Sequence, residues 1–338
     1  MKKLAIVIAL FGMILIPVLL SKKCDEPKIP KTSIAVFRFN SNMLQVEAEK
    51  GLLDKLINSD AFLKNRIKIE NFCAEGDLSA AKKIAQEILK ARFDMVVSIS
   101  TPMLQVMARE NKKGKVTHVF CAVTDPIAAG VGISGTGPAE HPHYMAGIST
   151  FQPVESIFRI ARQMNPELKK VGVVWCTVET CSKACVGKAR LICEELGIEL
   201  VEMTVEKDTQ VYDAAIAVCE KGVGALWIGG DNVVEPVIDK YVRAANKYRI
   251  PVLTNNPVHA FKGAMANLGA NYFEVGAAAG DLVYSIISGT PADKTTINSV
   301  VPEQLFINDS VRILMKDKWL LPEELLARTD SIVGRISF

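Results

Sequence analysis

The 338-residue sequence predicts an α/β protein with two Rossmann-like lobes, each built around a parallel sheet, and a ligand cleft between them. Short apolar runs rich in β-branched residues alternate with amphipathic, helix-length segments from Lys31 onward, which indicates parallel strands covered by helices on both faces. The alternation contains more strands than one sheet comfortably holds. The segment 130–144 is rich in Gly, Pro and Ser and interrupts the alternation, which restarts after about residue 150.

The expected strands are 33–39, 66–72, 95–99, 117–122, 170–176, 199–204, 225–229 and 251–254. The clearest expected helices are 79–92, 186–196 and 235–248. In open α/β sheets, ligands bind against the loops that follow the carboxyl ends of the strands. We therefore expect the functional side chains of this chain in those loops.

The loop after the strand that ends at Ile99 begins with Ser100, Thr101 and Pro102. Serine is a good N-cap, and proline suits the first turn of a helix. A helix that starts here presents free backbone N–H groups and the positive end of its dipole, which suits a ligand carboxylate.

The other expected loops also carry hydroxyl, amide or carboxylate side chains, namely Thr124 and Asp125, then Thr177, Glu179 and Ser182, then Asp231 and Asn232, and finally Thr254, Asn255 and Asn256. Turns favour such residues in any case, and Asp125 before Pro126 is as well explained by a turn as by a ligand contact. Five loops of this composition at equivalent positions predict a polar cleft.

Several of these loops, together with a later segment, resemble a known family: STPMLQ (100–105), VTDP (123–126), GIS (147–149), GGDN (229–232) and KGAMANLGANYFEVG (262–276). In this combination and order the sequence resembles the substrate-binding proteins of ABC transporters, in particular the tryptophan/tyrosine type. The resemblance implies the type I periplasmic-binding architecture, with a hinge of three crossings. It implies a first lobe of residues 30–148 and 268–296 and a second lobe of residues 149–267 and 297–338.

The resemblance also implies that a small, amino-acid-like ligand is trapped between closing lobes. Its position-by-position transfer places Ser100, Thr101 and Asp125 against the ligand from the first lobe, and Asp231, Asn232 and 254–256 from the second. The candidate ligand-binding set is completed by Asn40, Ser41, Thr124, Cys176, Thr177, Glu179, Cys181 and Ser182. The family has amides where this chain has Cys176 and Cys181, so the identity of the ligand stays open.

The stretch CTVETCSKAC (176–185) holds three of the eight cysteines. A disulfide from Cys176 to Cys181 or simple packing, a thiol that contacts ligand, and a soft-metal site are all open interpretations. A helix starting near Cys181 would lower the pKa of its thiol. Cys73, Cys121 and Cys219 lie in or beside apolar runs and are expected to pack as small hydrophobes.

His141 and His143 lie close to Met145 and form a second group of metal-binding residue types. Their loop is rich in Pro and Gly, and we expect it to be exposed to solvent. The spacings of the cysteines match no common zinc or iron–sulfur motif, so no metal and no cofactor are predicted.

The N-terminal segment 1–29 predicts a signal peptide or a membrane anchor. Lysines at positions 2 and 3 precede an apolar run over 4–20, and two more lysines follow at 22 and 23. A cleaved signal, an uncleaved anchor and lipidation of Cys24 all place the rest of the chain outside the cytoplasm, in contact with the membrane at most through this segment.

The composition argues against nucleic-acid binding, because the net charge is only +3, no run of like charge is long, and 7% of the residues are aromatic. Motifs of hydrolases, metalloproteases and nucleotide-binding enzymes do not follow the expected strands, so no enzymatic activity is predicted. The sequence predicts an extracytoplasmic solute-binding protein with an ABC permease as partner. The alternatives are a cysteine-dependent metal or redox-responsive binding protein and the ligand-sensing subunit of a membrane receptor.

Overall fold

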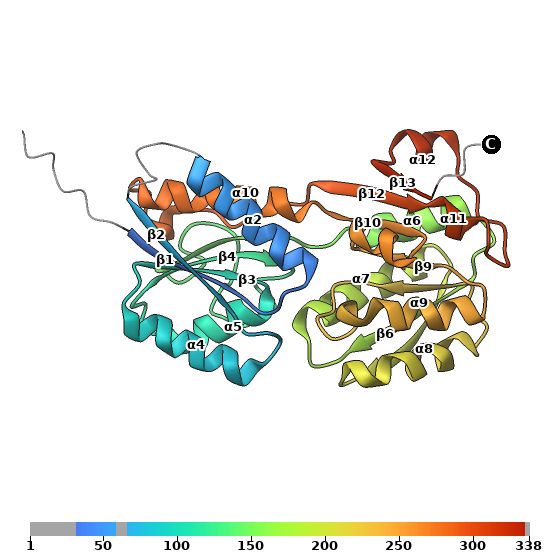
Figure 1. The fold of residues 1–338 in the computed structure, drawn as a ribbon, viewed down its shortest axis with the longest axis horizontal. Helices are drawn as coiled ribbons and strands as arrows, with labels where there is room; N and C mark the ends of the chain where they lie inside the picture. Colours follow the sequence, from blue (N-terminus) through green and yellow to red (C-terminus); the bar gives the residue numbers. More distant parts are fainter. Residues whose placement is uncertain (1–31, 59–65, 335–338) are drawn as a thin grey trace, which may run out of the picture. The chain divides into compact units, whose positions relative to one another are not determined.

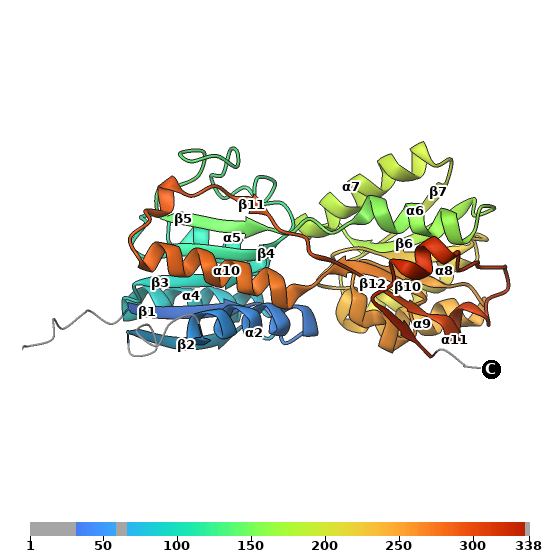
Figure 2. The same ribbon diagram turned by 90° about the horizontal axis from the view of Figure 1, so that it is seen from above.

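A computed structural model of the chain describes residues 32–58 and 66–334. Within these residues the chain forms two β-sheets, each with helices on both faces (Figure 1 and Figure 2). Strands and helices alternate along most of the chain, as the apolar periodicity of the sequence requires. The predicted α/β class is therefore confirmed.

The first sheet consists, in spatial order, of β11 (Asn298–Ser299), β5 (Met145–Ser149), β4 (Thr117–Val123), β3 (Met95–Ile99), β1 (Thr32–Arg38) and β2 (Ile67–Cys73), all paired in parallel. Helices α2 (Met43–Asn58) and α10 (Tyr272–Ile287) cover one face, and α4 (Leu78–Ala91) and α5 (Thr101–Glu110) cover the other. Along β1, Ile34 and Val36 pack under the first pair of helices. Ala35 and Phe37 pack under the second pair, because successive side chains of a strand point to opposite faces.

The second sheet consists of β13 (Ser331–Val333), β12 (Glu303–Asn308), β10 (Ala266–Ala270), β9 (Val252–Thr254), β8 (Ala225–Ile228), β6 (Lys170–Cys176) and β7 (Glu199–Val205). Only β10 and β12 pair antiparallel. Helices α6 (Val154–Met164) and α7 (Thr180–Glu195) cover one face, and α8 (Val211–Cys219) and α9 (Ile238–Lys247) cover the other. The shorter elements are η1 (Asp208–Gln210), η2 (Glu235–Val237), η3 (Pro257–Lys262), η4 (Ala292–Lys294), α11 (Asp309–Arg312) and α12 (Glu323–Ala327).

The chain passes from one sheet to the other after β5, after β10 and after β11. The second passage leads straight into α10, which lies along α2 over the first sheet (Figure 2). The two helices touch backbone to backbone at two glycines. A Cβ atom on Gly276 would lie 1.9 Å from the Ala48 carbonyl oxygen, and one on Gly51 would lie 1.9 Å from the Phe273 carbonyl oxygen. Only glycine permits this approach.

Two helices differ from the sequence prediction. Helix α7 begins at Thr180 and not at residue 186, because Cys181 and Cys185 bury on one helix face against the core and extend its apolar stripe. The expected helix 235–248 is divided into η2 and α9, and Pro236 lies in the first part.

No helix within residues 32–58 and 66–334 is long and apolar enough to cross a membrane. The predicted signal or anchor segment 1–29 and Cys24 lie outside the described residues.

Candidate functional site

Loops from the carboxyl ends of strands in both sheets surround a small cavity, which we call the central cavity, with a volume of about 40 Å³. Its lining residues are Asn42, Leu44, Gln45, Ser100, Thr101, Ala122, Thr124, Gln152, Cys181, Gly230, Asp231, Asn232, Glu235 and Tyr272. Six of them belong to the set predicted from the sequence, namely Ser100, Thr101, Thr124, Cys181, Asp231 and Asn232. The loops at the carboxyl ends of the parallel strands thus come together around one cavity, where ligands of such sheets bind.

Ser100 precedes α5 and holds an unusual conformation, with φ of 99°. Its hydroxyl makes no N-cap hydrogen bond, which corrects the predicted capping role, and its Oγ is buried with no partner. Backbone contacts hold the residue in place: its N–H donates to the Cys121 carbonyl at 3.1 Å, and its own carbonyl accepts from Leu104 at 3.1 Å. A non-glycine residue at positive φ is strained, and such residues concentrate at binding and catalytic sites.

Gln152 lines the central cavity from the passage between β5 and α6, and the sequence prediction missed it. It is 4% exposed, and its Oε1 atom has no hydrogen-bond partner. A signal was present, because Gln152 is a polar residue three positions after the carboxyl end of a predicted family segment, GIS at 147–149. The cavity thus holds two unpaired buried polar atoms, Ser100 Oγ and Gln152 Oε1.

Asp231 lines the central cavity, but all its hydrogen-bonding capacity is used within the protein. Oδ2 accepts from the Cys176 backbone N–H and from the Ser182 hydroxyl, both at 2.7 Å. Oδ1 accepts from the backbone N–H groups of Val233 and Val234, both at 2.9 Å. Cys176 and Ser182 were predicted to contact a ligand; the structure places both outside the cavity lining, where they hold Asp231.

Glu179 and Asn232 form a second internal cluster with Cys181. The Asn232 side chain donates to Glu179 Oε2 at 2.6 Å, and the Cys181 thiol donates to the same oxygen at 3.2 Å. Burial raises the pKa of the Cys181 thiol well above its usual value, and the negative charge of Glu179 raises it further. The predicted lowering of this pKa by the start of α7 is therefore wrong, because desolvation of the thiolate outweighs the helix dipole.

None of the seven cysteines in the described part of the chain forms a disulfide. The Cys176–Cys181 bridge considered from the sequence is absent, and burial raises the pKa of the Cys185 thiol to about 12. No group of three or more His, Cys, Asp or Glu side chains is placed to hold a metal within the described residues. Of the interpretations open at the sequence level, the geometry of the trio favours packing.

The histidine group also differs from expectation. His141 is 6% exposed, and its Nε2 atom lies 3.0 Å from the Thr295 carbonyl oxygen, so the expectation of an exposed histidine loop is wrong at this position. His143 lies edge-on to the Tyr144 ring with centroids 5.3 Å apart, and Met145 is buried at the start of β5.

Two predicted residues near β1 lie away from the central cavity. Ser41 is engaged with Arg38, whose guanidinium donates to its hydroxyl at 2.9 Å, and with Glu75, to which it donates at 3.1 Å. The Asn40 side chain accepts from the Asn42 backbone N–H at 3.1 Å. Neither residue lines the central cavity, so their predicted ligand contacts find no support in its lining.

Three other predicted residues also lie outside the lining. Asp125 accepts from the Ala128 backbone N–H at 2.9 Å, which is the turn-forming alternative. Thr177 is half-buried. The Thr254 hydroxyl lies within β9 and donates to the Asn267 side-chain oxygen at 3.0 Å.

Asn255 and Asn256 are buried and do not line the central cavity. Asn255 accepts from the Trp227 indole at 2.9 Å and donates to the Leu268 carbonyl at 2.9 Å, so it holds β8 and β10 together. Asn256 donates to Glu235 Oε2 at 3.4 Å and so supports a residue that does line the cavity.

Glu235 is another lining residue that the sequence prediction did not include in the site, because the segment was interpreted as the start of a helix. It sits on η2, is 8% exposed, and faces the central cavity. Burial raises the pKa of its carboxyl to about 8, and the negative charge of Asp231 adds to this. Hydrogen bonds from Asn256 and Gln152 act in the opposite direction.

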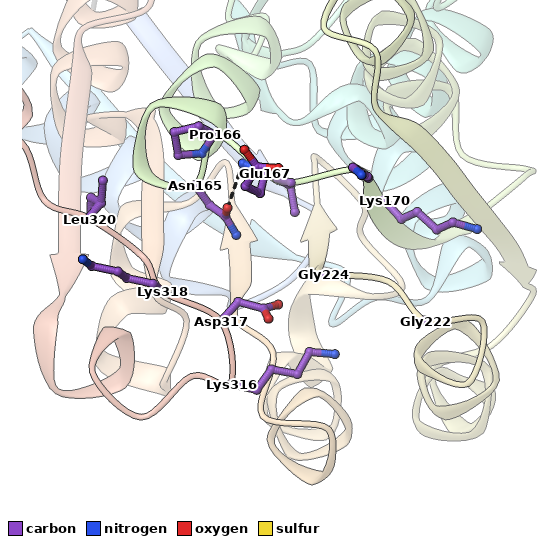
Figure 3. Close-up of a pocket in the computed structure, with 12 residues that line it drawn as sticks. Asn165, Pro166, Glu167, Lys170, Gly222, Gly224, Lys316, Asp317, Lys318 and Leu320 are labelled. Carbon is purple, nitrogen blue, oxygen red and sulfur yellow. Dashed lines mark hydrogen bonds between the residues drawn. The ribbon is translucent and has the colours of Figure 1, made fainter.

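Several further hollows lie on the described part of the molecule, one of them next to the central cavity and one at the other end of the second sheet. One of about 360 Å³ borders the central cavity and shares Leu44 and Tyr272 with it. The larger, of about 780 Å³, lies at the opposite end of the second sheet, where Lys170 begins β6 and Gly224 precedes β8 (Figure 3). Its side chains include exposed lysines such as Lys316, but it contains no residue of the predicted site.

Comparison with known proteins places the chain among transport proteins. A family model described as "ABC transporter substrate binding protein" matches residues 33–333. The chain is 24% identical over 289 residues to a "Tyrosine-binding protein" of Clostridioides difficile, covering 86% of this chain and 81% of the relative.

Two solved structures are similar over almost their whole length. A conserved domain protein of Vibrio cholerae has a TM-score of 0.82 at 26% identity, with 89% of this chain and 99% of the other covered. An ABC domain of Streptococcus pneumoniae in complex with L-Trp has a TM-score of 0.81 at 21% identity, with 90% and 100% covered. These likenesses confirm the predicted type I periplasmic-binding fold.

Proposed function

The chain belongs to the family of ABC transporter substrate-binding proteins, and we propose that it is an extracytoplasmic solute-binding protein that captures a small amino-acid-like ligand in the central cavity. An ABC permease is its proposed partner. The names of two similar proteins, a tyrosine-binding protein and an L-Trp complex, support this class of ligand.

The observation that carries the proposal is the pair of unpaired buried polar atoms in the central cavity. Ser100 Oγ and Gln152 Oε1 belong to the carboxyl ends of β3 and β5 and have no partner in the protein. An unsatisfied buried polar atom costs about 1–3 kcal/mol. A polar ligand that supplies the missing partners would recover this free energy, which supports the central cavity as the binding site.

Capture of such a ligand needs more room than the cavity now offers. Its volume is about 40 Å³, whereas ligand pockets for drug-sized molecules hold roughly 300–1,000 Å³. We propose that the lobes 30–148 with 268–296 and 149–267 with 297–338 open to admit the ligand and close over it. The three passages between the sheets would act as the hinge. Strand β11 belongs by sequence to the second proposed lobe, but it pairs with β5 in the first sheet.

The proposed location is supported by segment 1–29, whose lysines and apolar run favour export and a membrane tether. The family match supports the proposed permease partner. A ligand-sensing receptor subunit would use the same cavity and differ only in its membrane partner. The metal or redox alternative has less support, because the cysteines beside the cavity are buried thiols with raised pKa values.

The experiment is calorimetric titration of the full-length chain, purified in a mild detergent, with L-tyrosine and L-tryptophan and with ribose as a control. We expect at least one amino acid to bind with a single site and ribose not to bind. Binding of ribose with no heat from either amino acid would overturn the proposal. Mass spectrometry of an acid extract of the same preparation would identify any ligand retained during purification.

A further inference from the structure

The ionisable side chains that line the central cavity in the described part of the chain include acids and no bases. Its lining includes the carboxyls of Asp231 and Glu235, and the carboxyl of Glu179 lies directly behind Asn232. Among the described residues that line the cavity, none is a lysine, an arginine or a histidine. A ligand anion would therefore find no side-chain cation there, whereas a ligand cation would find carboxyl groups.

Two of these three carboxyls already accept hydrogen bonds from other groups of the protein. Asp231 uses both oxygens for four hydrogen bonds within its own sheet, and Glu179 Oε2 accepts from Asn232 and Cys181. A ligand that took over the oxygens of either carboxyl would leave backbone N–H groups or the Asn232 amide without a hydrogen-bond partner.

Glu235 is the carboxyl that stays available. The contact from Asn256 is long, at 3.4 Å. Gln152 and the Asp231 backbone are its other hydrogen-bonding neighbours, and the Oε1 atom of Gln152 is itself unpaired. Both Glu235 and Gln152 line the cavity, so a group placed between them meets two oxygen acceptors and no competing donor cation.

We propose that Glu235 binds the ammonium group of the ligand, with Gln152 Oε1 as a second acceptor, and that the site selects ligands by this cation. The proposal rests on the proposed function and adds the chemical group by which the ligand is recognised. A primary ammonium carries three N–H donors, which matches two fixed acceptors in the wall and leaves one donor for a group such as the unpaired Ser100 hydroxyl.

Binding of the ligand ammonium to Glu235 is coupled to release of a proton from the Glu235 carboxyl. Since the pKa of Glu235 is about 8, the carboxyl is mostly protonated at neutral pH, and ammonium binding requires it to ionise and release the proton. Affinity therefore rises with pH up to about 8. Below that value it falls by about tenfold per pH unit, until the pKa of the bound carboxyl is reached.

The titratable groups that face Glu235 from the neighbouring elements do not add to this pH dependence of the affinity. From η3, the pKa of His259 is lowered to about 3 by burial, so the imidazole stays neutral. From α7, burial raises the pKa of Cys185 to about 12 and that of Cys181 well above its usual value. Burial also raises the pKa of Tyr272 at the start of α10.

The two remaining acidic neighbours are Asp231, on the loop before η2, and Glu179, at the start of α7. Their hydrogen bonds lie within the second sheet and its helices, so a ligand between Glu235 and Gln152 leaves both acids as they are. The expected release is one proton from Glu235.

The test is calorimetry on the full-length chain in detergent with three probes that share one ring: L-tyrosine, tyramine, which lacks the carboxylate, and 3-(4-hydroxyphenyl)propionate, which lacks the ammonium. We expect tyramine to bind within about tenfold of L-tyrosine, and the propionate at least about a hundredfold more weakly. Titrations at pH 7 in two buffers of different ionisation enthalpy should show release of about one proton.

Variants separate this role from a structural one. Glu235→Gln keeps the size and the neutral state of the side chain, so the fold should persist while proton release disappears and L-tyrosine affinity at pH 8 falls by about a hundredfold. Glu194→Gln makes the same change at an exposed position on α7 and should alter neither.

The outcomes are distinguishable. If L-tyrosine binds with no proton release and Glu235→Gln binds it equally well, the inference is overturned and the proposed function stands. The inference is also overturned if the propionate binds as tightly as L-tyrosine. If none of the ammonium-bearing probes binds, and L-tryptophan and tryptamine fail as well, the proposed function falls and the inference falls with it.

Discussion

The Asp231 carboxylate accepts a hydrogen bond from the Ser182 hydroxyl at 2.7 Å, which joins the loop after β8 to the first turn of α7. The same oxygen accepts the Cys176 backbone N–H at the end of β6. One buried carboxylate thus holds two neighbouring strand ends and a helix start together, and it positions the wall of the central cavity from which Glu235 projects.

Replacement of Asp231 should therefore cost stability in addition to any loss of binding. Asp231→Ala leaves buried backbone N–H groups without partners, and we expect the free energy of unfolding to fall by about 3 kcal/mol or more, against about 1 kcal/mol for Ser182→Ala. Urea unfolding followed by far-UV circular dichroism measures both. Unchanged stability of Asp231→Ala together with lost ligand binding would instead identify Asp231 as a direct ligand contact.

Gln152 and Thr150 offer a matched pair, because each holds a buried side-chain oxygen without a partner but only Gln152 lines the cavity. Gln152→Leu should lower the affinity for L-tyrosine by about tenfold or more, since the ligand loses an acceptor. Thr150→Val should leave the affinity unchanged and raise the free energy of unfolding by up to about 1 kcal/mol. Equal effects of the two variants on affinity would argue against the central cavity as the site.

Gly276 should tolerate no side chain. Gly276→Ala would bring a Cβ atom to 1.9 Å from the Ala48 carbonyl oxygen and force α10 away from α2, which we expect to cost about 1–3 kcal/mol. Gly187 on α7 is the control, because a Cβ atom there meets nothing within 4 Å. Gly187→Ala should be neutral or stabilising by about 0.5–1 kcal/mol, since alanine favours the helix. Thermal unfolding of both variants decides the point, and a melting temperature for Gly276→Ala at or above that of the parent would contradict the packing.

The cysteine trio should behave as buried thiols. We expect Cys181 and Cys185 to react with iodoacetamide at pH 8 only after unfolding, because burial hides them and raises the pKa of both. Peptide mapping by mass spectrometry before and after addition of urea measures this. Rapid labelling of native Cys181, or a native disulfide between Cys176 and Cys181, would revive the redox interpretation.

Glu235 should make the fold less stable as the pH rises. Its folded-state pKa of about 8 lies above the ordinary value of a glutamate, so between these two values the folded chain holds a proton that the unfolded chain has lost. The free energy of unfolding therefore falls as pH increases through this window, by up to about 1.4 kcal/mol per pH unit.

Glu235→Gln should weaken this dependence and leave the part that comes from Glu179, whose pKa burial also raises. Glu194→Gln should keep the whole dependence, because Glu194 is exposed. Urea unfolding without ligand at pH 5, 6.5 and 8 compares the three proteins. A parallel pH profile for the parent and Glu235→Gln would show that Glu235 ionises normally in the folded chain.

The sequence alone determined the architecture and several of the residues that line the central cavity. Apolar runs separated by amphipathic helices require a covered parallel sheet, and the strands found from that pattern, such as Met95–Ile99 and Lys170–Cys176, lie where expected. The resemblance to ABC transporter substrate-binding proteins was also readable in the loops and is confirmed by the family match over residues 33–333. Polar residues placed directly after strands, such as Thr101 and Asn232, line the central cavity.

The tertiary structure decided which polar groups remain free. Residue type and spacing mark Asp231 and Glu235 alike as acids near a strand end, but hydrogen bonds from segments far along the chain, such as Ser182, occupy Asp231 and leave Glu235 available. Burial likewise set the state of Cys181, whose position at a helix start had predicted a lowered pKa. Such differences depend on which atoms meet across the fold and how much water they lose, and a local pattern of residues contains neither.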